Sequence, residues 1–176
     1  MKCLFFFILL FICSCSESNT NKIQQVYNNR KIITDIFLSK TITRNRDQKI
    51  ILFYTHSDNK TNKYFFELVN NHYRFTNDSI EYFPDLIKLK NNKGSDLYKQ
   101  ELASEIEKLL AKMDEFNIRD ISSEMAGVGI ALKIYMKAKG VMLYVPNPHE
   151  VLGSRFKDYI NSMQKLDDNW YYSMNE

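Results

Sequence analysis

Cysteine, glycine and proline are all scarce in this sequence of 176 residues. It contains 5 glycines and 3 prolines, too few for a collagen-like, linker-like or low-complexity chain. Its 3 cysteines are Cys3, Cys13 and Cys15, so the rest of the chain has no disulfide, no thiol nucleophile and no cysteine metal site. The formal net charge is only +3, which is too weak to indicate a nucleic-acid partner.

Catalytic motifs are missing as well. The sequence has neither the HExxH pattern of metalloproteases nor the GxSxG elbow of serine hydrolases. Gly127-Val128-Gly129 lacks the third glycine of a dinucleotide-binding turn and precedes a strand-like run. Glu101 and Glu105 are close enough in sequence to form a catalytic carboxylate pair, but they fall on the polar side of a predicted helix. We therefore expect no catalytic residue, no metal and no cofactor, and a protein that is not an enzyme.

The longest apolar run is short and lies at the start of the chain. Lys2 is followed by nine apolar residues, Leu4 to Ile12, and then by the polar residues 16–21. A helix needs about 20 apolar residues to cross a bilayer, whereas a basic start with a shorter apolar run is typical of a secretory signal. The first segment therefore predicts export.

The end of this run is Ile12-Cys13-Ser14-Cys15. It resembles the lipobox of bacterial lipoproteins, with an aliphatic residue at −3, a small residue at −1 and the required cysteine at +1; Cys13 at −2 is less usual. The resemblance implies cleavage after Ser14, fatty acylation of Cys15 and a membrane anchor facing the periplasm or the exterior. Ser16 in place of aspartate implies the outer membrane where the cell has one. The alternatives are an uncleaved anchor or an ordinary secretory signal.

The boundaries that follow are residues 1–14 for the signal peptide, 15–22 for the lipidated cysteine and a polar tether, and 23–176 for one domain. Strand-like and helical segments mix along that domain. The expected fold is α+β, a mainly antiparallel sheet with two or three helices packed on one face.

Three segments have apolar residues at helical spacing. The first runs from Ile23 to Phe37, with Asn28-Asn29 as an interruption. The second and clearest begins at Ser95 or Asp96, and its apolar stripe is Leu102, Ile106, Leu109, Leu110, Met113 and Phe116. The third starts after Ser154, and its apolar side is Phe156, Tyr159, Ile160 and Met163.

Several runs are typical of strands. Residues 49–56 form one, and KYFFELV-NN-HYRF predicts a hairpin, since asparagine tolerates the positive φ that its two-residue turn requires. That turn pairs Phe66 with Phe75 and Glu67 with Arg74. Further short strands are predicted at 80–83 and 170–174.

A second hairpin is expected around Lys139-Gly140, pairing Met136 with Leu143 and Ile134 with Val145. One face would be wholly apolar: Ile130, Leu132, Ile134, Met136, Leu143 and Val145. The other, solvated face would carry Lys133, Tyr135, Lys137, Met142 and Tyr144, with Tyr135 and Tyr144 as cross-strand partners.

The most unusual predicted surface combines aromatic and basic side chains. Its members are Lys133, Tyr135, Lys137, Tyr144, Trp170 and Tyr172. Rigid aromatic rings with cations are common in protein contacts. This face could instead be covered by the first helix or simply be solvated.

The leading hypothesis is a lipid-anchored envelope protein whose domain binds another protein without catalysis; one version is an immunity-type protein that blocks a toxin. The first alternative is an envelope hydrolase acting on cell-wall or glycan material, which would need a pocket holding two or more of His56, His72, Asp78, Glu81 and His149. The second is a structural or accessory component of an envelope complex. His56 and His72 could also approach each other across a sheet.

Overall fold

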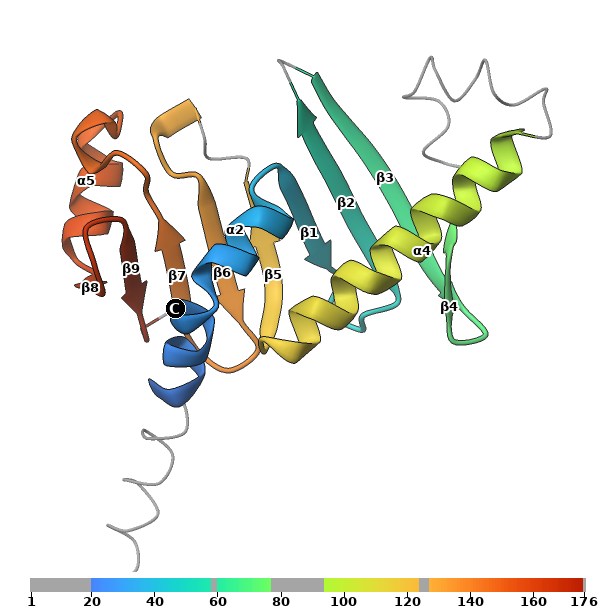
Figure 1. Cartoon of the computed structure of the whole chain (residues 1–176), viewed down its shortest axis with the longest axis horizontal. Helices are drawn as coiled ribbons and strands as arrows, with labels where there is room; N and C mark the ends of the chain where they lie inside the picture. Colours follow the sequence, from blue (N-terminus) through green and yellow to red (C-terminus); the bar gives the residue numbers. More distant parts are fainter. Residues whose placement is uncertain (1–19, 58–59, 77–93, 124–126, 176) are drawn as a thin grey trace, which may run out of the picture.

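One antiparallel sheet dominates the structure (Figure 1). The computed structural model describes residues 20–57, 60–76, 94–123 and 127–175. The strand order is β4-β3-β2-β1-β5-β6-β7-β9-β8. The strands are β1 (Lys40–Arg44), β2 (Ile50–Ser57), β3 (Lys60–Val69), β4 (His72–Phe75), β5 (Ile118–Ser122), β6 (Leu132–Met136), β7 (Val141–Tyr144), β8 (Gln164–Lys165) and β9 (Trp170–Ser173). The predicted α+β class with a mainly antiparallel sheet is confirmed.

Helices cover both faces of the sheet. Residues 20–28, α2 (Arg30–Phe37) and α4 (Gly94–Glu115) cross the face turned toward the viewer in Figure 1. A short 3-10 turn, η3 (Pro148–Glu150), precedes α5 (Ser154–Asn161), which packs on the other side. The prediction of two or three helices on one face is therefore wrong: the described residues contain four α-helical segments on two faces.

The main core lies between the sheet and the first three helices. Phe37, Ile42, Phe53, Phe66 and Met113 are fully buried there. All six residues of the predicted α4 stripe are buried, as are Ile23, Val26, Ile33 and Phe37 of the first helical segment. Helical periodicity therefore identified the buried side of both segments correctly, because one stripe of a helix must face the sheet.

A second core lies under α5, on the opposite face of β7 and β9. Ile160 and Met163 of the α5 segment pack with Val141, Leu143 and Tyr171. Met142 and Trp170 alternate with these strand residues and belong to the main core instead. Both faces of β7 and β9 are thus apolar, and each requires its own cover.

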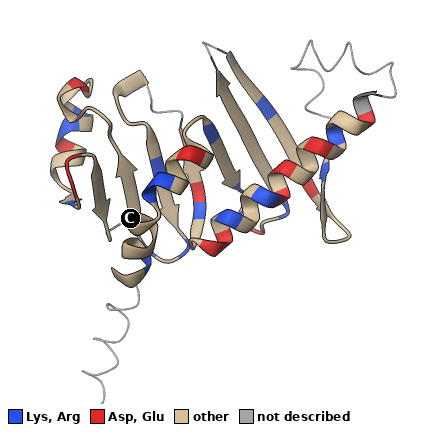
Figure 2. Ribbon diagram, in the orientation of Figure 1, with Lys and Arg blue, Asp and Glu red and all other residues tan. Residues whose placement is uncertain are grey.

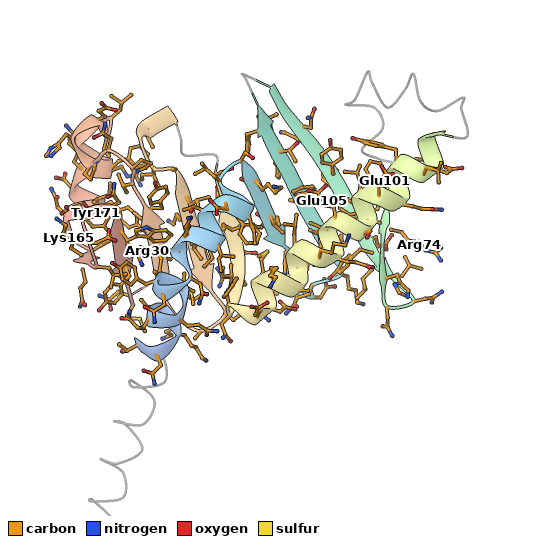
Figure 3. All side chains as sticks on the ribbon, viewed as in Figure 1. Arg30, Arg74, Glu101, Glu105, Lys165 and Tyr171 are labelled. Carbon is orange, nitrogen blue, oxygen red and sulfur yellow. The ribbon has the colours of Figure 1, made fainter. Side chains whose placement is uncertain are left out.

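The outer side of α4 is polar. Lysines and acidic residues are interspersed along it in Figure 2. Glu101 and Glu105 are exposed and point away from the sheet (Figure 3), as predicted. They do not form a carboxylate pair inside a cleft.

The first predicted hairpin is confirmed in turn and register. Asn70 and Asn71 have φ values of 52° and 64°, the left-handed conformation that this tight turn requires at both positions. Phe66 lies opposite Phe75, and Glu67 opposite Arg74. The two asparagines were enough to predict this hairpin, because the turn fixes the register of both strands.

The predicted register of the second hairpin is wrong. The structure pairs Ile134 with Met142 and Tyr135 with Val141, a shift of three residues from the expected pairing. The connection is four residues long, residues 137–140, and Met136 N–H donates to the Gly140 carbonyl at 3.0 Å. An odd shift turns every side chain of β7 to the other face. The alternation of polar and apolar residues could not reveal this register, because Val141, Met142 and Leu143 are all apolar and all buried.

Other differences concern element boundaries. Strands β1, β5 and β8 were not predicted, and the predicted strand at 80–83 lies outside the described residues. Residues 20–22, expected in the polar tether, belong to the first helix. The helix after Ser154 and the terminal strand are confirmed by α5 and β9.

Candidate binding surface

The face of the sheet that turns away from α2 and α4 carries a polar and aromatic hollow. Because side chains alternate along a strand, burial of Ile42, Phe53 and Ile121 under the helices places their neighbours on the opposite face. Together with Arg119, Ile121 and Tyr135, these neighbours surround a space of about 440 Å³, named here the open-face hollow. Its lining residues are Thr41, Thr43, Leu52, Tyr54, Arg119, Asp120, Ile121, Ser122 and Tyr135.

A β-bulge in β5 shapes this hollow. Ile118 lies opposite Met136, but Asp120 lies opposite Tyr135, so β5 has one extra residue at this point. Such a bulge breaks the two-residue alternation and redirects side chains. Arg119 and Asp120, although adjacent, therefore both line the hollow.

Asp120 links β5 to β1 through its side chain. The Arg44 backbone N–H donates to Asp120 Oδ1 at 2.9 Å. Arg119 Nε donates to Asp120 Oδ2 at 2.7 Å. One carboxylate thus joins β1 to β5 and fixes the Arg119 side chain beside the hollow.

Cations lie over the aromatic rings of this face. The Arg119 guanidinium is 5.5 Å from the centre of the Tyr135 ring, and Lys133 Nζ is 4.9 Å from the same centre. Lys63 Nζ lies 5.4 Å from the Tyr54 ring centre. Rings that carry cations in this way offer both flat apolar area and positive charge to a partner.

Lys133 also connects the hollow to α5. Its Nζ is 5.0 Å from the centre of the Tyr159 ring. Burial alone would lower the pKa of Lys133, but its hydrogen bonds to the hydroxyl groups of Tyr159 and Tyr135 raise that pKa above the usual value. The ammonium therefore stays charged at neutral pH.

A chain of hydroxyl groups lies beside the hollow. Thr41 Oγ1 accepts the Ser123 backbone N–H at 2.9 Å and lies 3.3 Å from His56 Nε2. His56 Nδ1 is 3.1 Å from Thr61 Oγ1. Thr41 and Ser123 are each only 4% exposed, so the Ser123 hydroxyl is closed to a substrate. These contacts hold strands together rather than form a nucleophile and its base.

The predicted aromatic and basic surface is split between two faces. Lys133 and Tyr135 lie on the open face, whereas Tyr144 lies on the helix-covered face and stacks on Trp170 with ring centres 5.1 Å apart. The expected cross-strand pairing of Tyr135 with Tyr144 is wrong, because the shifted register separates them.

The remaining members of that set also lie away from the hollow. Trp170 is 3% exposed and belongs to the main core, and Tyr172, which packs against it, hydrogen-bonds Gln164. Lys137 forms an ion pair with Asp114 at 2.9 Å. Tyr171 faces α5, so the terminal strand is covered on both sides.

The histidines are not brought together. His56 lies beside Thr61 of β3, whereas His72 lies beside Val69. These β3 positions are eight residues apart, about 26 Å at the rise of a strand. His149 lies in η3, near α5. Asp78 and Glu81 are outside the described residues, within which no group of three potential metal ligands occurs.

Comparison of the chain with protein-family models, with curated proteins and with solved structures gives no match. Among the helices of the described residues, none is long and apolar enough to cross a membrane.

Sequence reasoning missed most of the open-face hollow. Tyr54 lies in a predicted strand, and its alternation with Phe53 was a usable signal. Arg119 offered no such signal, because its position depends on the bulge beside it.

Proposed function

We propose that this protein is a membrane-anchored lipoprotein of the bacterial envelope, acylated at Cys15, and that its domain binds a protein partner through the open-face hollow without catalysing a reaction. The anchor is supported by the leader and by the Ile12-Cys13-Ser14-Cys15 sequence. The binding role is supported above all by Tyr54, Arg119 and Tyr135 gathered around one hollow.

The chemistry of the hollow favours protein recognition. Half-buried Tyr54 and Tyr135 offer apolar area, and neighbouring Thr43 and Asp120 offer hydrogen-bonding groups. Tyrosine and arginine are enriched among residues that dominate binding energy at interfaces. A partner with carboxylate groups in its contact surface fits the cations of this face, and its association should weaken as salt rises.

The binding role is tested by capture from the native envelope with the full chain. Tyr54→Ser combined with Arg119→Glu should lower recovery of the partner at least tenfold, because both an aromatic contact and a positive charge are removed. The matched control is Ile32→Ser with Lys31→Glu, two exposed positions on α2, which should leave recovery unchanged. Equal recovery with the hollow variant would refute this surface.

The anchor is tested separately. A fatty-acid analogue should label the wild-type chain and not the Cys15→Ala variant. That variant should also leave the membrane fraction, since stable attachment needs the acyl chains. Labelling that persists without Cys15 would contradict the proposed modification.

An immunity-type role is one specific form of this proposal. In that case the captured partner would be a toxin, and its gene is expected next to the gene of this protein. Purified chain should then protect cells from that toxin, and the hollow variant should not.

A further inference from the structure

The open-face hollow reaches the end of the sheet at which the described chain begins. At this end β1 and β6 finish and β5 starts (Figure 1). Thr43 and Tyr135 are each one residue from the end of their strands, and Arg119 is one residue from the start of β5. At about 3.3 Å per residue, these three hollow residues lie about 3 Å from the strand ends, whereas Thr41, Tyr54 and Ser122 lie about 10–13 Å from them.

The helix of residues 20–28 starts at the same end of the sheet. Ile23 lies beside Gly140, in the connection between β6 and β7. Gln25 Nε2 donates to the Glu115 carbonyl at 3.3 Å, at the end of α4. Ile23 and Val26 are buried in the main core. The start of this helix is therefore fixed to the domain and cannot lengthen the connection to an anchor without breaking core contacts.

Five residue steps separate Cys15 from Thr20. A chain spans at most about 3.6 Å per residue, so this connection reaches no more than about 18 Å whatever its conformation. The domain, and with it the end of the sheet that the hollow reaches, is therefore held close to the lipid surface.

We infer that the open-face hollow binds the extramembrane part of a membrane-embedded protein, at the level of the membrane surface. The inference rests on the proposed acylation of Cys15 and on the proposed binding role of the hollow. A partner held in the same membrane meets the hollow at a raised effective concentration. A freely diffusing partner gains nothing from so short a connection.

Photo-crosslinking in intact cells tests this inference. A photo-crosslinking phenylalanine derivative replaces Tyr54, which lines the hollow, in the full chain. The control position is Leu152, which is 61% exposed and lies beyond the other end of β7. The expected result is an adduct from position 54, and not from 152, that resists extraction of peripheral proteins from the membrane.

Two spacers inserted after Ser16 distinguish the effect of distance from the membrane from the effect of inserting extra residues. A helical spacer of about 30 residues lifts the domain by about 45 Å and should lower the yield of the position-54 adduct at least tenfold. A glycine-serine spacer of equal length has an r.m.s. span of about 30 Å and should retain most of the yield. Acylation and membrane recovery should be the same for both.

The outcomes distinguish the inference from its premises. The proposed function, and this inference with it, would be refuted by either of two results. One is a wild-type chain that does not fractionate with membranes, and the other is no adduct at position 54 under any condition. An adduct with a soluble protein, an adduct with phospholipid alone, or an undiminished yield with the helical spacer would refute only the inference.

Discussion

Replacing Asp120 should destabilise the fold and disturb the hollow together. Its carboxylate is 15% exposed and accepts the Arg44 backbone N–H and the Arg119 side chain. In Asp120→Ala, the partly buried Arg44 N–H loses its acceptor, which costs about 1–3 kcal/mol. Arg119 is 54% exposed, so losing its ion pair adds at most about 1 kcal/mol. We expect the free energy of unfolding to fall by about 2–3 kcal/mol.

Two matched variants separate these contributions. Asp120→Asn keeps an oxygen acceptor for the Arg44 N–H and should cost clearly less than the alanine variant, about 1 kcal/mol. Arg119→Gln removes only the exposed ion pair and should cost about 0.5 kcal/mol or less. The double variant should cost less than the sum of Asp120→Ala and Arg119→Gln, because both remove the same ion pair.

Urea unfolding provides the measurement. The sequence has a single tryptophan, Trp170, which is buried in the main core, so its fluorescence reports loss of the sheet directly. A cost of less than about 0.5 kcal/mol for Asp120→Ala, or one no larger than that of Arg119→Gln, would contradict this role of Asp120. The link between β1 and β5 would then not depend on this carboxylate. Asp120→Ala should also reduce partner capture, since Arg119 loses the bond that fixes it beside Tyr135.

Two further predictions concern stability. Burial alone would raise the pKa of Asp167, but hydrogen bonds from the Asn169 backbone and the Tyr27 hydroxyl hold it below its usual value. The stabilisation by this ionised carboxylate should be complete above about pH 5 and be lost as pH falls through the folded-state pKa. Urea unfolding should therefore show a difference between wild type and Asp167→Asn that shrinks below about pH 4; a constant difference would contradict this. At the β3–β4 turn, Asn71→Gly should be neutral or stabilising, whereas Asn71→Val should cost about 1–2 kcal/mol because its φ is 64°. Equal urea midpoints for these two variants would show that the turn conformation is not limiting.

Elements with strong local signals were predictable. The Asn70-Asn71 turn fixed one hairpin, because two positive φ angles determine both the turn and its register. The apolar stripe of α4 identified its buried side. By contrast, β1 was missed because Thr41 and Thr43 flank one buried isoleucine, Ile42, in a strand too short for a clear pattern.

Predictions failed where burial was two-sided or alternation was broken. The order Val141, Met142, Leu143 is equally compatible with either face, so the hairpin register was ambiguous and Tyr144 was placed on the wrong side. The bulge at Arg119 interrupts the alternation of side chains between the two faces of β5. Only the pairing of β5 with β6 reveals this bulge. Of the predicted aromatic and basic surface, only Lys133 and Tyr135 lie on the open face. Tyr54 and Arg119, which line the hollow there, were not predicted.

Local sequence patterns were enough to predict acylation at Cys15 and to identify the first hairpin, the buried sides of the helices and a domain without cysteine. Each depends on neighbouring residues or on the periodicity of one segment. Tertiary structure decided which strands meet, which face of β7 each helix covers, and that Tyr54, Arg119 and Tyr135 surround one hollow. These features depend on pairing between distant segments, which no local pattern of side chains specifies.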